Sequence, residues 1–154
     1  MITSPITRPI TEPITRAITA TGTGGSAVPE PAFRYLAGEG DSLTAGTNTG
    51  GTSFLTICST AASPAFPSYY ISAVGGSQVS GMVSRAAALD ATLGDDWNFL
   101  SVMIGTNDLS SGVNIPAFLT DLAAYLDARR AAGWLVVLHT IPPRNNAAFN
   151  ILRN

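Results

Sequence analysis

Short apolar segments alternate with segments of helical character along residues 33–141, and this alternation constrains the fold more than any other feature. The apolar segments occupy residues 33–38, 68–74, 97–104 and 134–141. The segments that predict helices between them occupy residues 53–62, 78–93 and 115–133. Strands that alternate with helices are typical of a parallel α/β sheet. Because the strands read as continuous apolar runs, we expect this sheet to be covered on both faces.

The longer helical segments carry apolar residues near one face, at the spacing of an amphipathic helix. The expected inward residues are Met82, Val83, Ala86, Leu89 and Leu93 in one helix and Phe118, Leu119, Leu122 and Leu126 in the other. Gly133 is expected to end the second of these helices, as glycine commonly does. The single cysteine, Cys58, is expected to be a small core residue. Residues 147–154 begin a further predicted helix.

A repeat precedes this part of the chain. Ile recurs at positions 2, 6, 10, 14 and 18, and Pro occupies positions 5, 9 and 13. The prolines rule out a regular helix and favour an extended, polyproline-like or β-edge arm, followed by a flexible Gly-rich joint. We therefore divide the chain into an arm and linker over residues 1–26 and a domain over residues 27–154. The arm is either a disordered linker or an assembly arm that packs on a partner, including a second copy of the chain.

Composition excludes several classes of function. Charged residues make up 12% of the chain and the net charge is −2, so no basic surface for nucleic acid is expected. One cysteine excludes an internal disulfide framework and a cysteine-based zinc site. No apolar run approaches the ~18 residues of a membrane span. A secretory signal is not apparent either, because the N-terminus lacks a continuous apolar core.

Distinctive residues follow the first three predicted strands, where parallel sheets gather their functional groups. Ser42 follows the first strand, Gly76 the second and Asn107 the third. A serine can attack a carbonyl once a base activates it, and the oxygen anion that forms then needs hydrogen-bond donors. The backbone N–H groups of Ser42 and Gly76 and the side-chain amide of Asn107 are candidate donors. Asp41 is expected to cap a helix that starts near Ser42, although Glu39 and Asp41 could also be a carboxylate pair or metal ligands.

Three short motifs resemble the nucleophile, glycine and Gly-x-Asn-Asp blocks of the GDSL or SGNH hydrolases. They are GDSLTAG at 40–46, VGGSQVSG at 74–81 and IGTND at 104–108, and the resemblance covers roughly residues 33–152. It implies a flavodoxin-like three-layer α/β/α fold with a parallel sheet, and ester hydrolysis without a metal or organic cofactor. It also implies Ser42 as nucleophile, Ser42, Gly76 and Asn107 as oxyanion donors, and Asp108 as a supporting residue that fixes the loop.

The sequence departs from this family at the block Asp-x-x-His, which supplies the base and its orienting acid. The only histidine is His139, and the residue three positions before it is Val136. The resemblance therefore implies a truncated member that lacks the last helix–strand unit. His139, at the end of the fourth strand, is either a substitute base or a histidine that hydrogen-bonds a neighbouring loop.

The expected function is that of a serine ester hydrolase whose substrate is a small ester or an acylated glycan, in the class of carbohydrate or lipid esters. The alternative rests on the repeat, which resembles the N-terminal arms of phage or prophage tail-associated proteins. In that case the domain would be a non-catalytic glycan-binding or structural module of a tail-like assembly. The location is left open between the cytoplasm and a phage particle.

Overall fold

A computed structural model of the chain describes residues 33–47, 49–62, 65–66, 68–94 and 97–143. They belong to one compact unit, Pro31–Asn154. The arm over residues 1–26 and the helix expected from residue 147 lie outside the described residues. The division of the chain at residues 26 and 27 therefore stays a prediction.

In the part of the chain that the structure describes, four parallel strands form the sheet, which confirms the predicted α/β class. They are β1 (Phe33–Gly40), β2 (Tyr69–Ile71), β3 (Trp97–Met103) and β4 (Trp134–Leu138). Their order across the sheet is β2-β1-β3-β4, which is the order of the corresponding strands in flavodoxin-like folds. All four strands run in the same direction, and Gly38 pairs with Ile71 on one side and Ser101 on the other. Their carboxyl ends therefore meet at one edge of the sheet.

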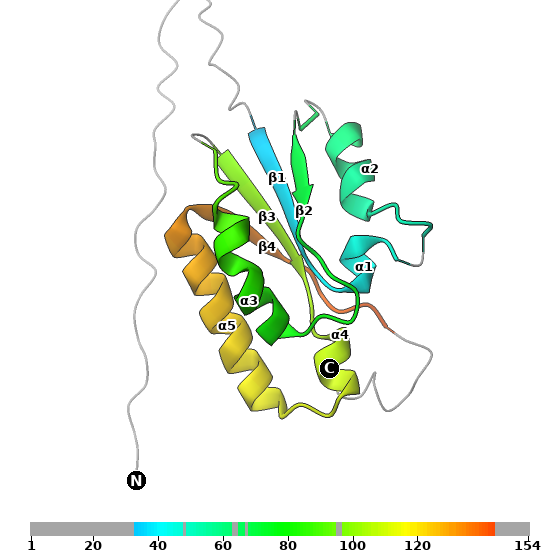
Figure 1. Cartoon of the computed structure of the whole chain (residues 1–154), viewed down its shortest axis with the longest axis vertical. Helices are drawn as coiled ribbons and strands as arrows, with labels where there is room; N and C mark the ends of the chain where they lie inside the picture. The colour runs from blue at the N-terminus through cyan, green and yellow to red at the C-terminus, as the bar shows by residue number, and fades with distance from the viewer. Residues whose placement is uncertain (1–32, 48, 63–64, 67, 95–96, 144–154) are drawn as a thin grey trace, which may run out of the picture. The chain divides into compact units, whose positions relative to one another are not determined.

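Helices lie on both faces of the sheet (Figure 1). They are α1 (Ser42–Ala45), α2 (Phe54–Ala61), α3 (Val79–Asp90), α4 (Thr106–Ser110) and α5 (Ile115–Ala132). Figure 1 shows α3 and α5 side by side on one face, while α1 and α2 lie on the other, near β1 and β2. In the described residues no helix is both long enough and apolar enough to cross a membrane.

Local sequence explains where several of these helices begin and end. The Asp41 carboxylate accepts the Leu43 N–H at 2.9 Å, which confirms the expected cap of α1. Ser53 caps α2 in the same way, and Asn114 caps α5, which has a proline in its first turn. Gly133 ends α5 with φ 112°, a left-handed conformation, as predicted.

A hydrophobic core lies between the sheet and the α3–α5 layer. It is built mainly from Ala37, Leu100, Val102 and Trp134 of the strands, Met82 and Leu89 of α3, and Phe118, Leu122, Tyr125 and Leu126 of α5. The prediction is wrong for two residues that were expected to point inward, since Val83 is 54% exposed and Leu119 is 55% exposed. Each follows a buried residue directly, and one step along a helix turns a side chain by about 100°. The buried faces of α3 and α5 are therefore narrower than the stripes of apolar residues along these helices. Cys58 is exposed on α2 and is not a core residue.

The outer strand β4 departs from the expectation of a sheet covered on both faces. Leu135, Val137 and Leu138 are 42%, 48% and 47% exposed. Within the described part of the chain, β4 pairs with β3 alone. Among the described residues, α5 packs on β4 and Trp134 is buried, but the exposed side chains of this strand have no covering layer although they are apolar.

Candidate functional site

Ser42 lies where β1 gives way to α1, at the carboxyl edge of the sheet. It is the first residue of α1 and is partly buried. Its hydroxyl has no hydrogen-bond partner among the described residues. Gly40, two residues earlier, has φ 154°, and a β-carbon there would collide with the Met103 carbonyl. The GDS sequence therefore combines a backbone turn that glycine permits with a serine hydroxyl that is free to react.

The two glycines after β2, Gly75 and Gly76, occupy different positions in one turn. The Ser77 N–H donates to the Val74 carbonyl at 3.1 Å, which closes a turn over Val74–Ser77. Gly76 is the third residue of this turn and has φ 76°, as a type II turn requires. Gly75 lies against Ser42, since a β-carbon on Gly75 would be 3.8 Å from the Ser42 β-carbon. The sequence singled out Gly76, whose role as an oxyanion donor stays a prediction, and the structure adds Gly75 as the neighbour of Ser42.

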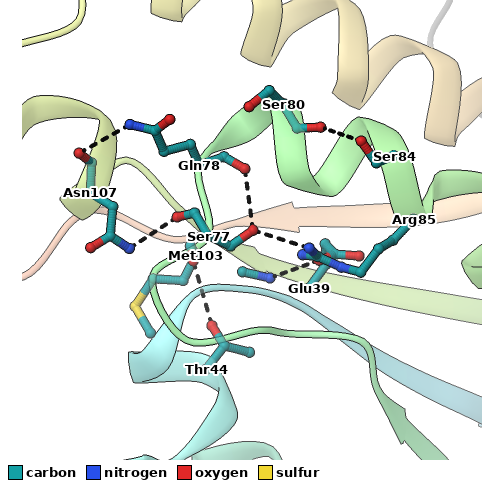
Figure 2. Close-up of polar contacts among 10 residues, drawn as sticks. Glu39, Thr44, Ser77, Gln78, Ser80, Ser84, Arg85, Met103 and Asn107 are labelled. Carbon is teal, nitrogen blue, oxygen red and sulfur yellow. Dashed lines mark hydrogen bonds and ion pairs between the residues drawn. The ribbon is translucent and has the colours of Figure 1, made fainter. Parts of the chain in front are cut away.

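Asn107 of α4 connects the Val74–Ser77 turn to the Ser42 turn. Its Nδ2 donates to the Ser77 carbonyl at 2.9 Å and to an Asp41 carboxylate oxygen at 3.4 Å. Gln78 makes a second link at the end of α4, because its Nε2 donates at 2.5 Å to Oγ of Ser111, the residue that caps this helix. Figure 2 shows Asn107 and Gln78 facing each other across this junction. The structure thus brings together the three strand ends that the sequence singled out.

The Asp108 side chain contacts the start of α3, and its predicted role in fixing the loop stays a prediction. Its Oδ1 accepts the Val79 N–H at 3.2 Å, which ties α4 to the first residue of α3. The side chain is buried, and Oδ2 has no hydrogen-bond partner among the described residues. Burial raises the pKa of the Asp108 carboxyl above its ordinary value.

His139 is held by the neighbouring strand. Its Nε2 lies 2.8 Å from Ser101 Oγ of β3, and its ring packs edge-on against Phe54 of α2 with centroids 5.7 Å apart. Its backbone N–H donates to the Val102 carbonyl at 2.8 Å. No hydrogen bond joins His139 to Ser42 among the described residues. His139 thus bonds a residue of the adjacent strand and not the neighbouring loop that the sequence suggested. A role for His139 as the base stays a prediction.

A buried ion pair adjoins the site, and sequence reasoning missed it. Glu39, the second-last residue of β1, is 0% exposed, and its Oε1 accepts from Arg85 Nη2 of α3 at 2.5 Å. Burial raises the pKa of the Glu39 carboxyl, while hydrogen bonds from Arg85 and Ser72 partly oppose that rise. In the described chain, no group of three or more His, Cys, Asp or Glu side chains could hold a metal ion. The charged partner of Glu39 is the Arg85 guanidinium.

This fold and this cluster define a three-layer α/β protein with a serine, a glycine turn and an asparagine at the carboxyl edge of its sheet. The sequence model of the GDSL-like Lipase/Acylhydrolase family matches residues 40–153. The chain therefore belongs to the GDSL-like lipase/acylhydrolase family, a family of ester hydrolases. A comparison with curated proteins finds no match.

Solved structures of SGNH and GDSL proteins share the fold. A lipolytic G-D-S-L family protein from Veillonella parvula has a TM-score of 0.65 at 18% identity, over 78% of this chain and 67% of that chain. AlinE4, an SGNH-hydrolase family esterase, has a TM-score of 0.64 at 22% identity, over 78% and 66%. The psychrotrophic esterase EstA from Pseudoalteromonas sp. has a TM-score of 0.59 at 20% identity, over 77% and 67%. At these identities the likeness establishes the fold alone.

Proposed function

We propose that this chain carries the nucleophile and the oxyanion donors of a serine ester hydrolase. The observation that carries the proposal is the meeting of Ser42, Gly75 and Asn107 at one edge of the sheet. The Ser42 hydroxyl would attack the ester carbonyl, the alcohol would leave, and the acyl group would stay on Ser42 until water releases it. The described residues offer this hydroxyl without a competing hydrogen bond.

The donors for the oxygen anion would come from the backbone and from Asn107. The N–H groups of Ser42, Gly75 and Gly76 have no acceptor among the described residues. One hydrogen of Asn107 Nδ2 is used by the Ser77 carbonyl at 2.9 Å, while the contact to Asp41 is long at 3.4 Å. The second hydrogen of Asn107 Nδ2 is therefore available to donate to a substrate oxygen. Gly75 is added to the donors because it lies against Ser42.

The proton of Ser42 also needs an acceptor, and His139 is engaged by Ser101. Without a base, a serine enzyme keeps only the part of catalysis that comes from the oxyanion donors and binding, roughly 10³–10⁴-fold over water. We therefore expect the 154-residue chain by itself to hydrolyse esters slowly, and to react faster when an Asp-x-x-His segment supplies the base.

The test compares the chain with Ser42→Ala and with Ser84→Ala, a control at an exposed position of α3. Release of 4-nitrophenol from 4-nitrophenyl acetate should be slower in Ser42→Ala than in the chain, down to the rate that the oxyanion donors and binding support without a nucleophile, and it should stay unchanged in Ser84→Ala. Because EstA is described as inhibited by monoethylphosphonate, a phosphonate ester should add mass to the Ser42 peptide alone. Equal hydrolysis by the chain and Ser42→Ala, together with no mass shift, would sink the assignment.

The substrate class that we propose is an ester of a carbohydrate or lipid with a small acyl group. The family description, lipase and acylhydrolase, supports an ester bond in general. Rates of hydrolysis measured on acetylated glycans and on esters with acyl chains of increasing length would separate these substrates. Activity that rises with chain length would contradict a preference for small acyl groups.

A second candidate is a non-catalytic module of a tail-like assembly, in which the Ile-Thr-x-Pro repeat of residues 1–26 contacts a partner or another copy. Light scattering of the chain with and without residues 1–26 separates an assembly arm from a tether. An unchanged oligomeric state after removal of the arm would contradict this candidate.

A further inference from the structure

We propose that Glu39, Arg85 and Ser77 form a positioning chain that holds the Asn107 amide and the Val74–Ser77 turn in place beside Ser42. The catalytic meaning of this inference rests on the proposed function, whereas the contacts themselves do not. Figure 2 shows the chain running from Glu39 through Arg85 and Ser77 to Asn107. Each link joins two different elements of the fold.

The first link is the ion pair between β1 and α3. Glu39 is completely buried, one of its oxygens has no partner among the described residues, and the Arg85 side chain is 24% exposed. Buried ion pairs often contribute no more stability than apolar residues of the same size would. Removing one partner is nevertheless costly, because the other charge is left alone in the interior. We therefore infer that the Glu39–Arg85 pair mainly fixes the position of α3 on β1 and adds little to the stability of the fold.

The second link uses the forked shape of the Arg85 guanidinium. Nη2 donates to Glu39, and Nη1 donates to Ser77 Oγ at 3.1 Å. A lysine ammonium is a compact point charge without this fork. Arginine can thus transmit the position of the buried Glu39 to the Val74–Ser77 turn, and lysine is a poor replacement.

The third link passes through Ser77 itself. Its hydroxyl accepts from Arg85, its N–H closes the turn on Val74, and its carbonyl accepts from Asn107 Nδ2 at 2.9 Å. The position of this one residue therefore sets both the turn that holds Gly75 and the orientation of the Asn107 amide.

Gly81 gives independent support from within α3. Glycine weakens a helix relative to alanine, so its presence inside α3 needs a reason. A β-carbon on Gly81 would lie 2.6 Å from Ser77 Oγ and 3.3 Å from Arg85 Nη1. The missing side chain leaves the space in which Arg85 meets Ser77.

The experiment uses the full chain and three variants, Ser77→Ala, Arg85→Lys and Arg85→Met. Arg129→Met is the control, because Arg129 of α5 is a buried arginine that also pairs with a carboxylate of α3, Asp90 at 2.7 Å, but away from Ser77 and Asn107. The first readout is the side-chain amide signal of Asn107 by NMR, assigned with Asn107→Asp. The second is kcat and KM for 4-nitrophenyl acetate, and the third is the melting temperature.

We expect Ser77→Ala and both Arg85 variants to shift the Asn107 amide signals and to speed their hydrogen exchange. Their kcat should fall roughly 10- to 100-fold with KM changed less, since a misplaced donor mainly affects the transition state. Arg129→Met should lower the melting temperature without moving the Asn107 signals or kcat. Unchanged Asn107 signals in Ser77→Ala and Arg85→Met would overturn the inference.

The two proposals can fail separately. If Ser42→Ala hydrolyses the ester as fast as the unchanged chain and the phosphonate ester adds no mass to the Ser42 peptide, the proposed function fails, and the Asn107 signals still decide whether the positioning chain exists. If Ser42→Ala is inactive while Ser77→Ala keeps full kcat, the function stands and the positioning role is wrong.

Discussion

At the scale of single residues, Glu39 places an ionisable group where water cannot reach it. Burial favours the neutral carboxyl, and this effect outweighs the hydrogen bonds that favour the charged form, so the pKa of Glu39 in the fold lies above 4.5. The folded state therefore holds the Glu39 proton more tightly than the unfolded chain does. Its contribution is favourable at low pH and is lost as pH rises through the folded pKa.

We predict a difference in pH dependence between the unchanged chain and Glu39→Gln. The free energy of unfolding of the unchanged chain should fall as pH rises from about 4 through the raised pKa of Glu39. Glu39→Gln, which cannot ionise, should show a smaller fall over the same window. Urea unfolding at a series of pH values measures both curves, with the exposed Asp127→Asn as control. A steeper fall in Glu39→Gln would contradict the raised pKa.

The sequence predicted only some of the residues that surround Ser42. Ser42, Asn107 and Asp41 stand in short motifs, and the cap made by Asp41 depends on the chain two residues away. The pairing of Glu39 with Arg85 joins residues 46 positions apart. No local periodicity or turn chemistry reports such a contact, because it depends on how α3 packs on the sheet.

At the scale of elements, the close approach of the β1–α1 turn to β3 decides where Ser42 lies. Gly40 pairs with Met103 in the register of β1 and β3, and Thr44 Oγ1 of α1 donates to the Met103 carbonyl at 3.5 Å. A β-carbon at Gly40 would occupy the space of both the Met103 carbonyl and the Thr44 hydroxyl. The approach of these elements therefore requires glycine at this position.

Gly40→Ala should lower the free energy of unfolding by about 2–4 kcal/mol, through backbone strain and a collision with backbone atoms that cannot move freely. Gly50→Ala is the control, since Gly50 has φ 66° but an added β-carbon there meets no atom within 4 Å. The control should lose only about 1 kcal/mol, the cost of the left-handed conformation. Denaturant unfolding measures both, and equal losses would contradict a role for the contact.

The faces of α3 and α5 show which buried residues of a helix its apolar spacing predicts. The apolar spacing of α3 and α5 correctly predicted that Met82, Leu89, Phe118, Leu122 and Leu126 are buried. It failed at the borders of the buried faces. Leu119 instead lines a hollow of about 620 Å³ together with Leu138, His139 and Ile141. Whether a border residue is covered depends on the neighbouring elements, which the helix pattern does not specify.

At the scale of the whole described unit, β4 presents an open edge with exposed apolar side chains. Open strand edges favour pairing between molecules, and natural sheets usually protect them. Leu135 and Val137 are alternate residues of β4 and are 42% and 48% exposed. Side chains at alternate positions of a strand lie on the same face, so the two form one apolar surface.

We predict that the 154-residue chain associates through this strand and that Val137→Lys reduces the association, because a charge on an edge strand opposes pairing. The weight-average mass from light scattering should fall toward that of a monomer in Val137→Lys. Thr140→Lys, an exposed position after β4, is the control and should change the mass less. A mass that does not change in Val137→Lys would show that the open strand does not drive association.

The sequence by itself determined the class of fold, the succession of strands and helices, and the motifs that carry Ser42 and Asn107. These features depend on residue periodicity and turn chemistry among near neighbours in the chain. Only the tertiary structure decided that Gly75 faces Ser42, that His139 bonds Ser101, and that Glu39 reaches Asn107 through Arg85 and Ser77. Those relations depend on strand register and helix packing between distant segments, for which a single sequence has no local signal.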